Sequence, residues 1–302
     1  MNLASLDLNL VPSLRALLEE RSVTRAGGRV GLSQPAMSAA LARLRHHFDD
    51  DLLTRTGNRY DLTPLGAALL ERTATACDLL ERVFTTQAHF DPAAEQREFT
   101  LLGVDYGFAV FGAALARLVH HEAPGVHLRF RQADPQITEQ TGAMLSVVDG
   151  VLMPHGIISG FPAVELFHDR WVCLIADDHP DVGERLTLDD LSQLPWAVYQ
   201  RPYDAPVNRQ LSMLGIDPRV EVSVQSFQLL PALVAGTRRV ALIQERLARQ
   251  LHSTVAVRVL PCPFDAVPVR EALWWHPLHA QDAGHIWLRE TAARVGQDIA
   301  EG

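Results

Sequence analysis

A helix, a glycine turn and a second helix within residues 22–48 constrain the fold of this chain most strongly. Ser22 can cap a short helix, Gly31 supplies a turn, and Ser33 can cap a longer helix. Serine is a favoured N-cap because its hydroxyl accepts a bond from a backbone N–H that has no partner inside the helix. An amphipathic helix that ends near Glu20 precedes this pair, so the sequence predicts a three-helix domain.

The longer of these helices has one apolar and one exposed face. Its apolar residues recur at steps of four, three and four, which is helical periodicity. Small and polar residues occupy the opposite face, as the major groove of DNA requires for close approach. Glutamine can pair with adenine through two bonds, and a hydroxyl can contact a base or a phosphate. The apolar positions are Met37, Leu41, Leu44 and Phe48; the exposed face holds Gln34, Pro35, Ser38, Ala39 and Arg43.

Two short extended runs follow the third helix. Residues 52–55 and 59–62 flank Gly57-Asn58, a dipeptide that favours a hairpin turn. Such a hairpin places Arg55 and Arg59 beside its tip. Basic side chains there would meet the sugar-phosphate backbone or the minor groove, as the wing of a winged helix-turn-helix does.

The charge of the chain is distributed unevenly. Residues 21–59 hold seven arginines and three acidic residues, a local balance of +4. Residues 91–302 hold 17 arginines and 26 acidic residues, which accounts for the whole net charge of −9. An acidic body with one basic segment is typical of a small nucleic-acid module joined to a domain that does not bind nucleic acid.

Length and composition are those of an ordinary globular protein. The 302 residues can form two or three domains, and 47% of them are hydrophobic. A run of 18 apolar residues is missing, so no membrane span is expected. The N-terminus lacks the pattern of a secretory signal, which makes the cytoplasm the expected location. The three cysteines share no ligand-like spacing, which argues against a disulfide framework or a zinc site.

A long helix is predicted from Pro64 to about residue 90. Its apolar residues alternate at three and four positions, which is the pattern of a two-stranded coiled coil. A helix packed on its own domain remains the alternative. Residues 91–96 are polar, contain proline and predict a hinge. The seam positions are Leu62, Leu65, Leu69, Ala76, Leu79 and Val83.

The remaining two hundred residues alternate between apolar strands and helices. This order predicts α/β lobes with mostly parallel sheets, in which small ligands bind beyond the carboxyl ends of strands. A helix through Val119 should follow the first strand. The predicted strands cover residues 99–104, 127–131, 150–153, 171–176, 220–224, 240–243 and 256–260.

The N-terminal motifs together resemble those of the LysR-type transcription regulators. The core Ser33-Gln-Pro-Ala-Met-Ser38, the wing Leu52-Leu-Thr-Arg55 and the exit Leu62-Thr-Pro-Leu-Gly66 occur in order and at the family's spacing. The resemblance implies that Gln34, Pro35, Ser38 and the position of Ala39 face bases. It also implies that Ser22, Thr24, Ser33, Arg55 and Thr56 face the DNA backbone.

Two features depart from the family's pattern. Gly27 and Gly28 stand in the second helix, where the family has helix formers, and each glycine costs about 0.5–1 kcal/mol relative to alanine. This helix is either softer than usual or packed unusually close. Ala39 stands where many members carry a longer polar side chain, which makes direct base readout there doubtful.

The resemblance extends over the C-terminal residues, on the branch of nodulation-type and aromatic-catabolism regulators. Asp105-Tyr106, Asp169-Arg-Trp-Val-Cys-Leu174 and Val234-Ala-Gly-Thr237 carry it. It implies two lobes like a periplasmic binding protein, with an effector cleft between them. Asp105 would disfavour a plain carboxylate ligand, whereas neutral or hydroxylated aromatic molecules would fit. The implied cleft residues are Asp105, Tyr106, Met153, His155, Gln225, Ser226 and Phe227.

The resemblance also implies an organisation and partners. The winged helix-turn-helix would cover residues 1–63, the dimerisation helix 64–90, the hinge 91–96 and the effector-binding domain 97–302. Within that last domain, lobe one would hold residues 97–166 and 268–302, and lobe two residues 167–267. The expected partners are promoter DNA, a small-molecule effector, a second copy in a homodimer or homotetramer, and RNA polymerase; no membrane and no cofactor are expected.

Two regulators of the same fold are alternatives. One senses no small molecule. The other responds through a cysteine, but Cys173 lies within an apolar strand, which indicates an unreactive thiol.

An enzyme and an exported solute-binding protein fit the sequence less well. His276, His279 and His285, and the pair His120-His121, could suggest a metal, but they lack a convincing third ligand, so exposed or capping histidines are favoured. Neither a phosphate-binding glycine loop nor a Gly-x-Ser-x-Gly elbow occurs, and no catalytic residue is predicted. A solute-binding protein would need an export signal.

Overall fold

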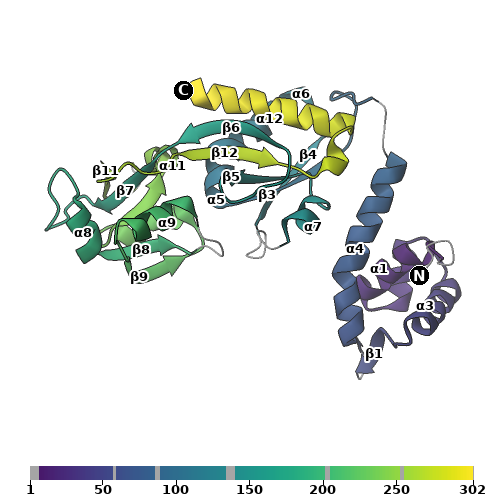
Figure 1. The fold of residues 1–302 in the computed structure, drawn as a ribbon. Coiled ribbons are helices and arrows are strands. Elements are labelled where there is room, and N and C mark those ends of the chain that lie inside the picture. The colour runs from purple at the N-terminus through teal and green to yellow at the C-terminus, as the bar shows by residue number, and fades with distance from the viewer. Residues whose placement is uncertain are drawn as a thin grey trace. The chain divides into compact units, whose positions relative to one another are not determined.

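Two units make up the chain (Figure 1). The computed structural model describes residues 7–56, 59–85, 89–133, 140–200, 205–251 and 255–301. Backbone contacts separate residues 1–86 from residues 87–302, and each unit contains its own buried apolar clusters.

The N-terminal unit contains the three predicted helices and the predicted hairpin. The apolar faces of the helices form one core, and Met37 and Leu18 are fully enclosed in it. The hairpin strands pair antiparallel, with Leu53 opposite Leu62. The turn Gly57-Asn58 lies outside the described residues. The elements are α1 (Leu10–Glu20), α2 (Val23–Arg29), α3 (Gln34–Phe48), β1 (Leu53–Thr56), β2 (Arg59–Leu62) and α4 (Pro64–Thr85).

The first half of α4 packs on the N-terminal unit itself. Leu62, Leu65 and Leu69 lie against the core that α1 and α3 form. These three side chains are only partly buried by this packing, so the predicted pairing of the helix with a second subunit stays a prediction. The described part of the helix runs to Thr85, residues 86–88 lie outside the described residues, and residues 89 and 90 are not helical. The side chains of the seam positions Leu79 and Val83 lie outside the described residues.

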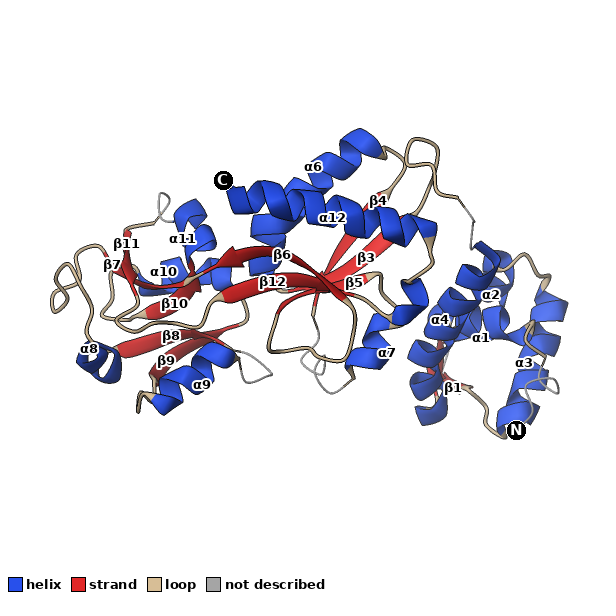
Figure 2. Cartoon of the chain, turned by 45° about the horizontal axis from the view of Figure 1, so that its top comes forward, coloured by secondary structure: helices blue, strands red, loops and turns tan. Residues whose placement is uncertain are grey.

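A five-stranded sheet forms one part of the C-terminal unit, with strand order β4-β3-β5-β12-β6. β4 and β5 run parallel to β3, whereas β12 runs antiparallel to both β5 and β6. Figure 2 shows α6 and α12 above this sheet. The strands are β3 (Glu98–Gly103), β4 (His127–Gln132), β5 (Gly150–Pro154), β6 (Ala163–Asp169) and β12 (Val269–Trp274).

Two smaller sheets form the other part of the C-terminal unit. β10 and β11 flank β7 antiparallel, and β8 pairs with β9 in parallel. Only Arg170 separates β6 of the large sheet from β7 of the small one, so this connection and the β11–β12 connection join the two parts. The strands are β7 (Trp171–Ala176), β8 (Pro195–Tyr199), β9 (Arg219–Val224), β10 (Ala241–Gln244) and β11 (Val257–Pro261).

The predicted mostly parallel sheets are wrong, because the large sheet is mixed and the three-stranded sheet is antiparallel; only the β8–β9 pair is wholly parallel. The prediction missed β6, β8 and β12. β12 contains Arg270 and Glu271 side by side, and β8 begins with Pro195, so neither presents the apolar run used to find strands. Antiparallel β12 returns the chain to the large sheet, which sequence order alone does not reveal.

Helices connect the strands of the C-terminal unit. The helix predicted after β3 forms, and its middle five residues make π-type turns. None of the described helices is both long and apolar enough to cross a membrane. The helices are α5 (Asp105–Gly107), a π-helix (Phe108–Gly112), α6 (Ala113–Glu122), α7 (Thr141–Leu145), α8 (Leu188–Gln193), α9 (Pro206–Met213), α10 (Leu230–Val234), α11 (Glu245–Leu251) and α12 (Ala283–Glu301), with 3₁₀ turns at Phe227–Leu229 and Pro277–His279.

Candidate nucleic-acid interface and effector site

The exposed face of α3 is the face predicted from its periodicity. Met37, Leu41 and Leu44 are buried in the domain core, as predicted. The opposite side carries an alanine and a proline at its N-terminal end, so the backbone there has little side-chain cover. The exposed residues include all five predicted on this face: Gln34, Pro35, Ser38, Ala39 and Arg43.

Serine caps begin both helices of the motif. The Ser22 hydroxyl accepts a bond from the backbone N–H of Arg25, and the Ser33 hydroxyl accepts one from Ala36, each at 3.4 Å. Both caps were predicted. Thr24 lies exposed in the first turn of α2. The two hydroxyls thus cap their helices. Each hydroxyl still has its O–H donor and a second lone pair, which can form a hydrogen bond with DNA.

Gly27 is required by the close packing of α2 on the turn that follows. A Cβ at this position would lie 2.8 Å from the carbonyl oxygen of Leu32 and 3.5 Å from Cβ of Met37. At Gly28 no described atom would lie within 4 Å of an added Cβ. Of the two readings of this glycine pair, close packing holds for Gly27. Gly28 remains a site of low helix propensity.

An arginine of α3 that was not predicted as a site residue holds the wing against this helix through two hydrogen bonds. Arg45 donates from Nε to the carbonyl oxygen of Asp51 at 2.8 Å and from Nη2 to that of Leu53 at 2.9 Å. Arg55 lies exposed in β1, opposite Tyr60. Thr56 and Arg59 face each other across the hairpin, and their side chains lie outside the described residues.

Arg43 forms an ion pair on the exposed face of α3. Its Nη2 lies 2.5 Å from Oδ2 of Asp7, and this hydrogen bond lowers the pKa of the Asp7 carboxyl. Both side chains are accessible to solvent, so the pair is weak and screened by salt. A phosphate could therefore displace Asp7 from Arg43.

Asp105 joins the two parts of the C-terminal unit. It begins α5, beyond the carboxyl end of β3, where a ligand site is expected in this architecture. Its Oδ2 accepts bonds from the Ser226 hydroxyl at 2.7 Å and from the backbone N–H of Gln228 at 3.0 Å. Both donors follow β9 of the smaller sheets. This carboxylate is thus a charge-assisted bridge between the two parts.

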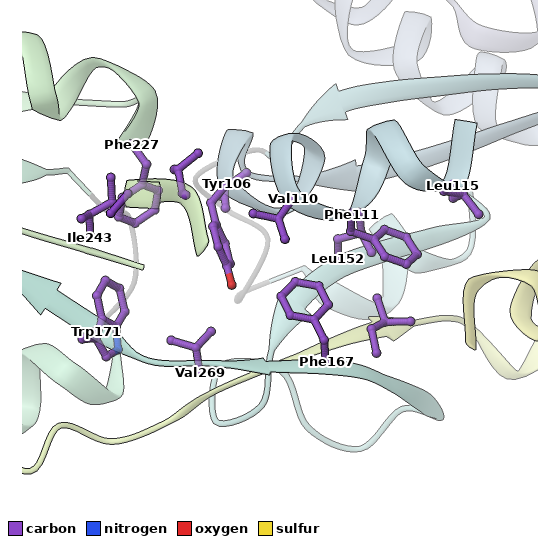
Figure 3. Close-up of a cluster of buried hydrophobic side chains, with 14 of the residues drawn as sticks. Tyr106, Val110, Phe111, Leu115, Leu152, Phe167, Trp171, Phe227, Ile243 and Val269 are labelled. Atoms are coloured by element: carbon purple, nitrogen blue, oxygen red, sulfur yellow. The ribbon is translucent and has the colours of Figure 1, made fainter. Parts of the chain in front are cut away.

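Aromatic side chains gather beside this bridge. The ring centroid of Phe227 lies 6.4 Å from that of Tyr106, 6.3 Å from that of Trp171 and 4.0 Å from that of Tyr199. Figure 3 shows Tyr106 between Phe227 and Phe167, with its hydroxyl directed away from Phe227. Tyr106 and Phe227 are only 1% and 2% exposed, so the rings close on each other in this structure.

Two buried carboxyl groups lie under the aromatic rings. The Tyr106 hydroxyl donates to Oδ2 of Asp169 at 2.9 Å. Glu271 of β12 is fully buried, and burial followed by the charge of Asp169 raises its pKa to about 8. Burial also raises the pKa of Asp169. Asp169 and Glu271 were not predicted as site residues, because no local sequence pattern marks a carboxylate as buried.

Two of the predicted cleft residues pack with the apolar cluster on the other face of the large sheet, and a third is exposed to solvent. Met153 is fully buried on the opposite face of the large sheet, because side chains alternate along β5 and Leu152 takes the face toward Tyr106. Met153 therefore faces away from this cluster, and its part in effector binding stays a prediction. His155 packs edge-on against Trp274, with its Nε2 3.7 Å from Glu165, and Gln225 is exposed. The structure brings together Asp105, Tyr106, Ser226 and Phe227.

The histidines near the C-terminus differ from expectation. His276 caps a 3₁₀ turn, as expected, but His279 and His285 are buried, with ring centroids 4.6 Å apart and rings nearly parallel. Burial and the charge of His279 lower the pKa of His285 to about 3. Among the described residues no group of three or more possible ligands could hold a metal ion.

The structure brings Cys173 and Cys262 together although the sequence separates them by 89 residues. Their Sγ atoms lie 3.9 Å apart, and both thiols are free. The contact with Cys262 and burial raise the pKa of Cys173. A raised pKa lowers the thiolate fraction at neutral pH and hence the reactivity of this thiol.

Comparison with known families matches both units. Residues 8–67 match the sequence profile "Bacterial regulatory helix-turn-helix protein, lysR family", and residues 95–297 match "LysR substrate binding domain". Nodulation protein D 2 of Rhizobium tropici is 32% identical over 293 residues, which cover 96% of this chain and 93% of that protein. Nodulation protein D 1 of Mesorhizobium japonicum is 33% identical over 294 residues, with coverages of 96% and 93%.

Solved structures show the same fold. A probable transcriptional regulator from Pseudomonas aeruginosa superposes with a TM-score of 0.73 at 29% identity, over 96% of this chain and 97% of that one. Full-length CbnR in complex with its target DNA gives a TM-score of 0.68 at 14% identity, over 96% and 100% of the two chains.

A helix-turn-helix with a wing, joined to a two-part α/β binding domain, defines a DNA-binding transcription regulator rather than an enzyme. The chain belongs to the LysR family of these regulators and is homologous to the nodulation D proteins. The predicted family, fold class and absence of enzymatic function are confirmed.

Proposed function

We propose that this LysR-family regulator binds operator DNA as a homodimer or homotetramer in the cytoplasm and responds to a small effector bound between the two parts of its C-terminal unit. In this proposal residues 1–63 read DNA, 64–90 contribute to dimerisation, 91–96 act as the hinge and 97–302 bind the effector. RNA polymerase is the proposed downstream partner.

The main support for sequence-specific DNA binding is the solvent-exposed N-terminal end of α3, where the side chains are short. Gln34, Pro35, Ser38 and Ala39 are exposed in consecutive turns, while the next residues inward hold the domain core. Short side chains let the helix backbone approach the bases, and Gln34 supplies a side chain that can make two bonds to adenine. Ser22, Thr24, Ser33, Arg43, Arg55, Thr56 and Arg59 are the proposed backbone contacts.

The observation that carries effector binding is the Asp105–Ser226 bond beside the aromatic cluster. A ligand that binds here replaces contacts between the two parts of the C-terminal unit with contacts to the ligand. Its binding therefore changes how the two parts are held together. Binding energy spent in this way shifts a conformational equilibrium. A regulator of the same fold without an effector is the alternative.

Immunoprecipitation of the protein from cells, with sequencing of the bound DNA, tests the proposal. We expect enrichment of a palindromic site, because a two-fold symmetric dimer reads two half-sites. The matched variants Gln34→Ala and Arg55→Ala separate the two kinds of contact. Gln34→Ala should relax the preference at one base pair, and Arg55→Ala should weaken all sites alike. Absence of an enriched site would refute sequence-specific regulation.

A further inference from the structure

Glu271 is a buried carboxyl group without a hydrogen-bond partner. It lies in β12, opposite Phe167 of β6 and Pro154 of β5. Its side chain is 0% exposed, and neither carboxyl oxygen has a partner among the described residues. Leaving a buried polar group unsatisfied is costly, so such groups in folded proteins call for an explanation.

The neighbours of Glu271 do not satisfy it. Asp169 of β6 uses its own oxygens on other donors: the Tyr106 hydroxyl at 2.9 Å and the backbone N–H groups of Arg170 at 2.8 Å and Arg246 at 3.3 Å. The Arg246 guanidinium, from α11, lies 6.0 Å from the ring centroid of Phe167. Tyr106 of α5 is committed to Asp169. Two carboxyl groups thus share this site, and only one of them has donors.

The surroundings of Glu271 suit a positive charge next to an aromatic ring. The ring centroids of Tyr106 and Phe167 lie 6.3 Å apart. Glu271 lies next to α5, because its Oε1 would be 3.6 Å from a Cβ added to Gly107. Phe227, Trp171 and Tyr199 extend the aromatic wall. Ring faces attract cations, and an ammonium group offers three donors to an acceptor that has none.

We propose that Glu271 is the anionic recognition group for a small aryl-substituted amine, which is the effector class of this site. The proposal rests on the effector site proposed above. A carboxylate effector would be repelled by the carboxyl groups of Asp169 and Glu271. The guanidinium of Arg246 lies near them and would offset only part of that repulsion. The ligand's ring takes the place of ring–ring contacts around Phe227, and its ammonium group donates to Glu271.

Amine binding at this site should release a proton. Because the pKa of Glu271 is raised to about 8, the carboxyl is protonated at neutral pH in the unliganded protein. An ammonium donor stabilises the carboxylate instead, so the proton of Glu271 leaves to solvent on binding. Below pH 8 the affinity should therefore rise about tenfold per pH unit, by proton linkage.

Titration calorimetry of the full-length protein tests this with three probes of equal ring and chain length: phenethylamine, phenethyl alcohol and phenylacetate. We expect phenethylamine to bind the wild type at least tenfold more tightly than the other two. Glu271→Gln should lose that advantage and keep the affinity for phenethyl alcohol. Glu165→Gln, which removes an exposed carboxylate from β6, is the matched control and should change none of the three affinities.

Each of the following results would overturn the proposal: equal affinities of the wild type for amine and phenylacetate, no loss of amine binding in Glu271→Gln, or no binding of phenethylamine at millimolar concentration. A pH-independent affinity for the amine would refute the role of Glu271 even if the amine binds. Glu271→Asp keeps the carboxylate but places it one methylene farther from the ligand, so it should lose part of the affinity for the amine. It also provides a second test in case the Gln variant does not fold.

Operator binding by the same preparations separates this proposal from the proposed function. If wild type and variants bind an enriched DNA site but fail the amine test, only the effector class is wrong. If the wild type binds no DNA site preferentially, the proposed regulator function fails independently of Glu271.

Discussion

Glu271→Gln should change the pH dependence of stability of the C-terminal unit even without a ligand. The carboxyl has a pKa of about 8 in the folded protein and an ordinary value of 4.5. Between these values the folded state holds a proton that the unfolded state has lost. The free energy of unfolding of the wild type therefore falls as pH rises through this window, by about 1.36 kcal/mol per unit.

The full difference between the two pKa values corresponds to about 5 kcal/mol of stability lost between pH 4.5 and pH 8. Glutamine has nearly the same shape and does not titrate. The unfolding free energy of the variant minus that of the wild type should thus increase by roughly 2–3 kcal/mol from pH 5.5 to pH 7.5. His285, whose pKa is lowered to about 3, contributes the opposite slope, but it is present in both proteins and cancels.

Urea unfolding followed by tryptophan fluorescence measures this difference directly. All five tryptophans lie between residues 171 and 287, so the signal reports on the C-terminal unit alone. Experiments at pH 5.5, 6.5, 7.5 and 8.5 give the slope. A variant-minus-wild-type difference that stays constant across this range would show that Glu271 does not hold a proton in the folded protein, and would refute the reasoning.

Three further predictions follow from local geometry. Gly27→Ala should destabilise the N-terminal unit, because its Cβ would lie 2.8 Å from the Leu32 carbonyl oxygen. Gly28→Ala should instead stabilise the unit by about 0.5–1 kcal/mol, because alanine has the higher helix propensity. Thermal melting followed by circular dichroism compares the two variants, and equal effects would contradict the close packing at Gly27. Arg55→Ala should weaken operator and random DNA binding by the same factor and lower the salt slope by about one, so a changed base preference in a binding titration would refute the wing assignment. Asp105→Ala should lower the unfolding free energy of the C-terminal unit by about 1.5–3 kcal/mol or more, because three hydrogen bonds to its carboxylate are lost, two of them from the other part of the unit; an unchanged urea midpoint would show that these bonds contribute nothing.

The N-terminal unit was predictable from sequence because its signals are local. A serine cap, a glycine turn and apolar steps of three and four each act within one or two turns of helix. The capping bonds of Ser22 and Ser33 and the burial of Met37 were all found as predicted. The coiled-coil seam stays a prediction for a related reason. Leu65 and Leu69 have the right spacing, but spacing does not tell whether α1 or a second subunit covers them.

The C-terminal unit was less predictable because its arrangement depends on distant segments. β12 joins the large sheet between β5 and β6, although it begins 100 residues after the end of β6, and no local pattern indicates that pairing. Met153 and Leu152 are both apolar, so the face that each occupies follows only from the register of β5 in the sheet. His279 and His285 are polar residues enclosed by packing, against the usual preference for the surface.

The burial of Glu271 could not be predicted from the sequence, and it also bears on the function of the site. By sequence it follows an exposed Arg270 in an unrecognised strand, where a solvated charge would be the ordinary expectation. The fold instead encloses it, beside a second carboxyl group and without donors. Packing alone would be served as well by an apolar side chain, which would avoid the cost of desolvation. A residue that opposes local stability in this way is most readily explained by what the site does, because departures from consistent packing concentrate where a protein binds or switches.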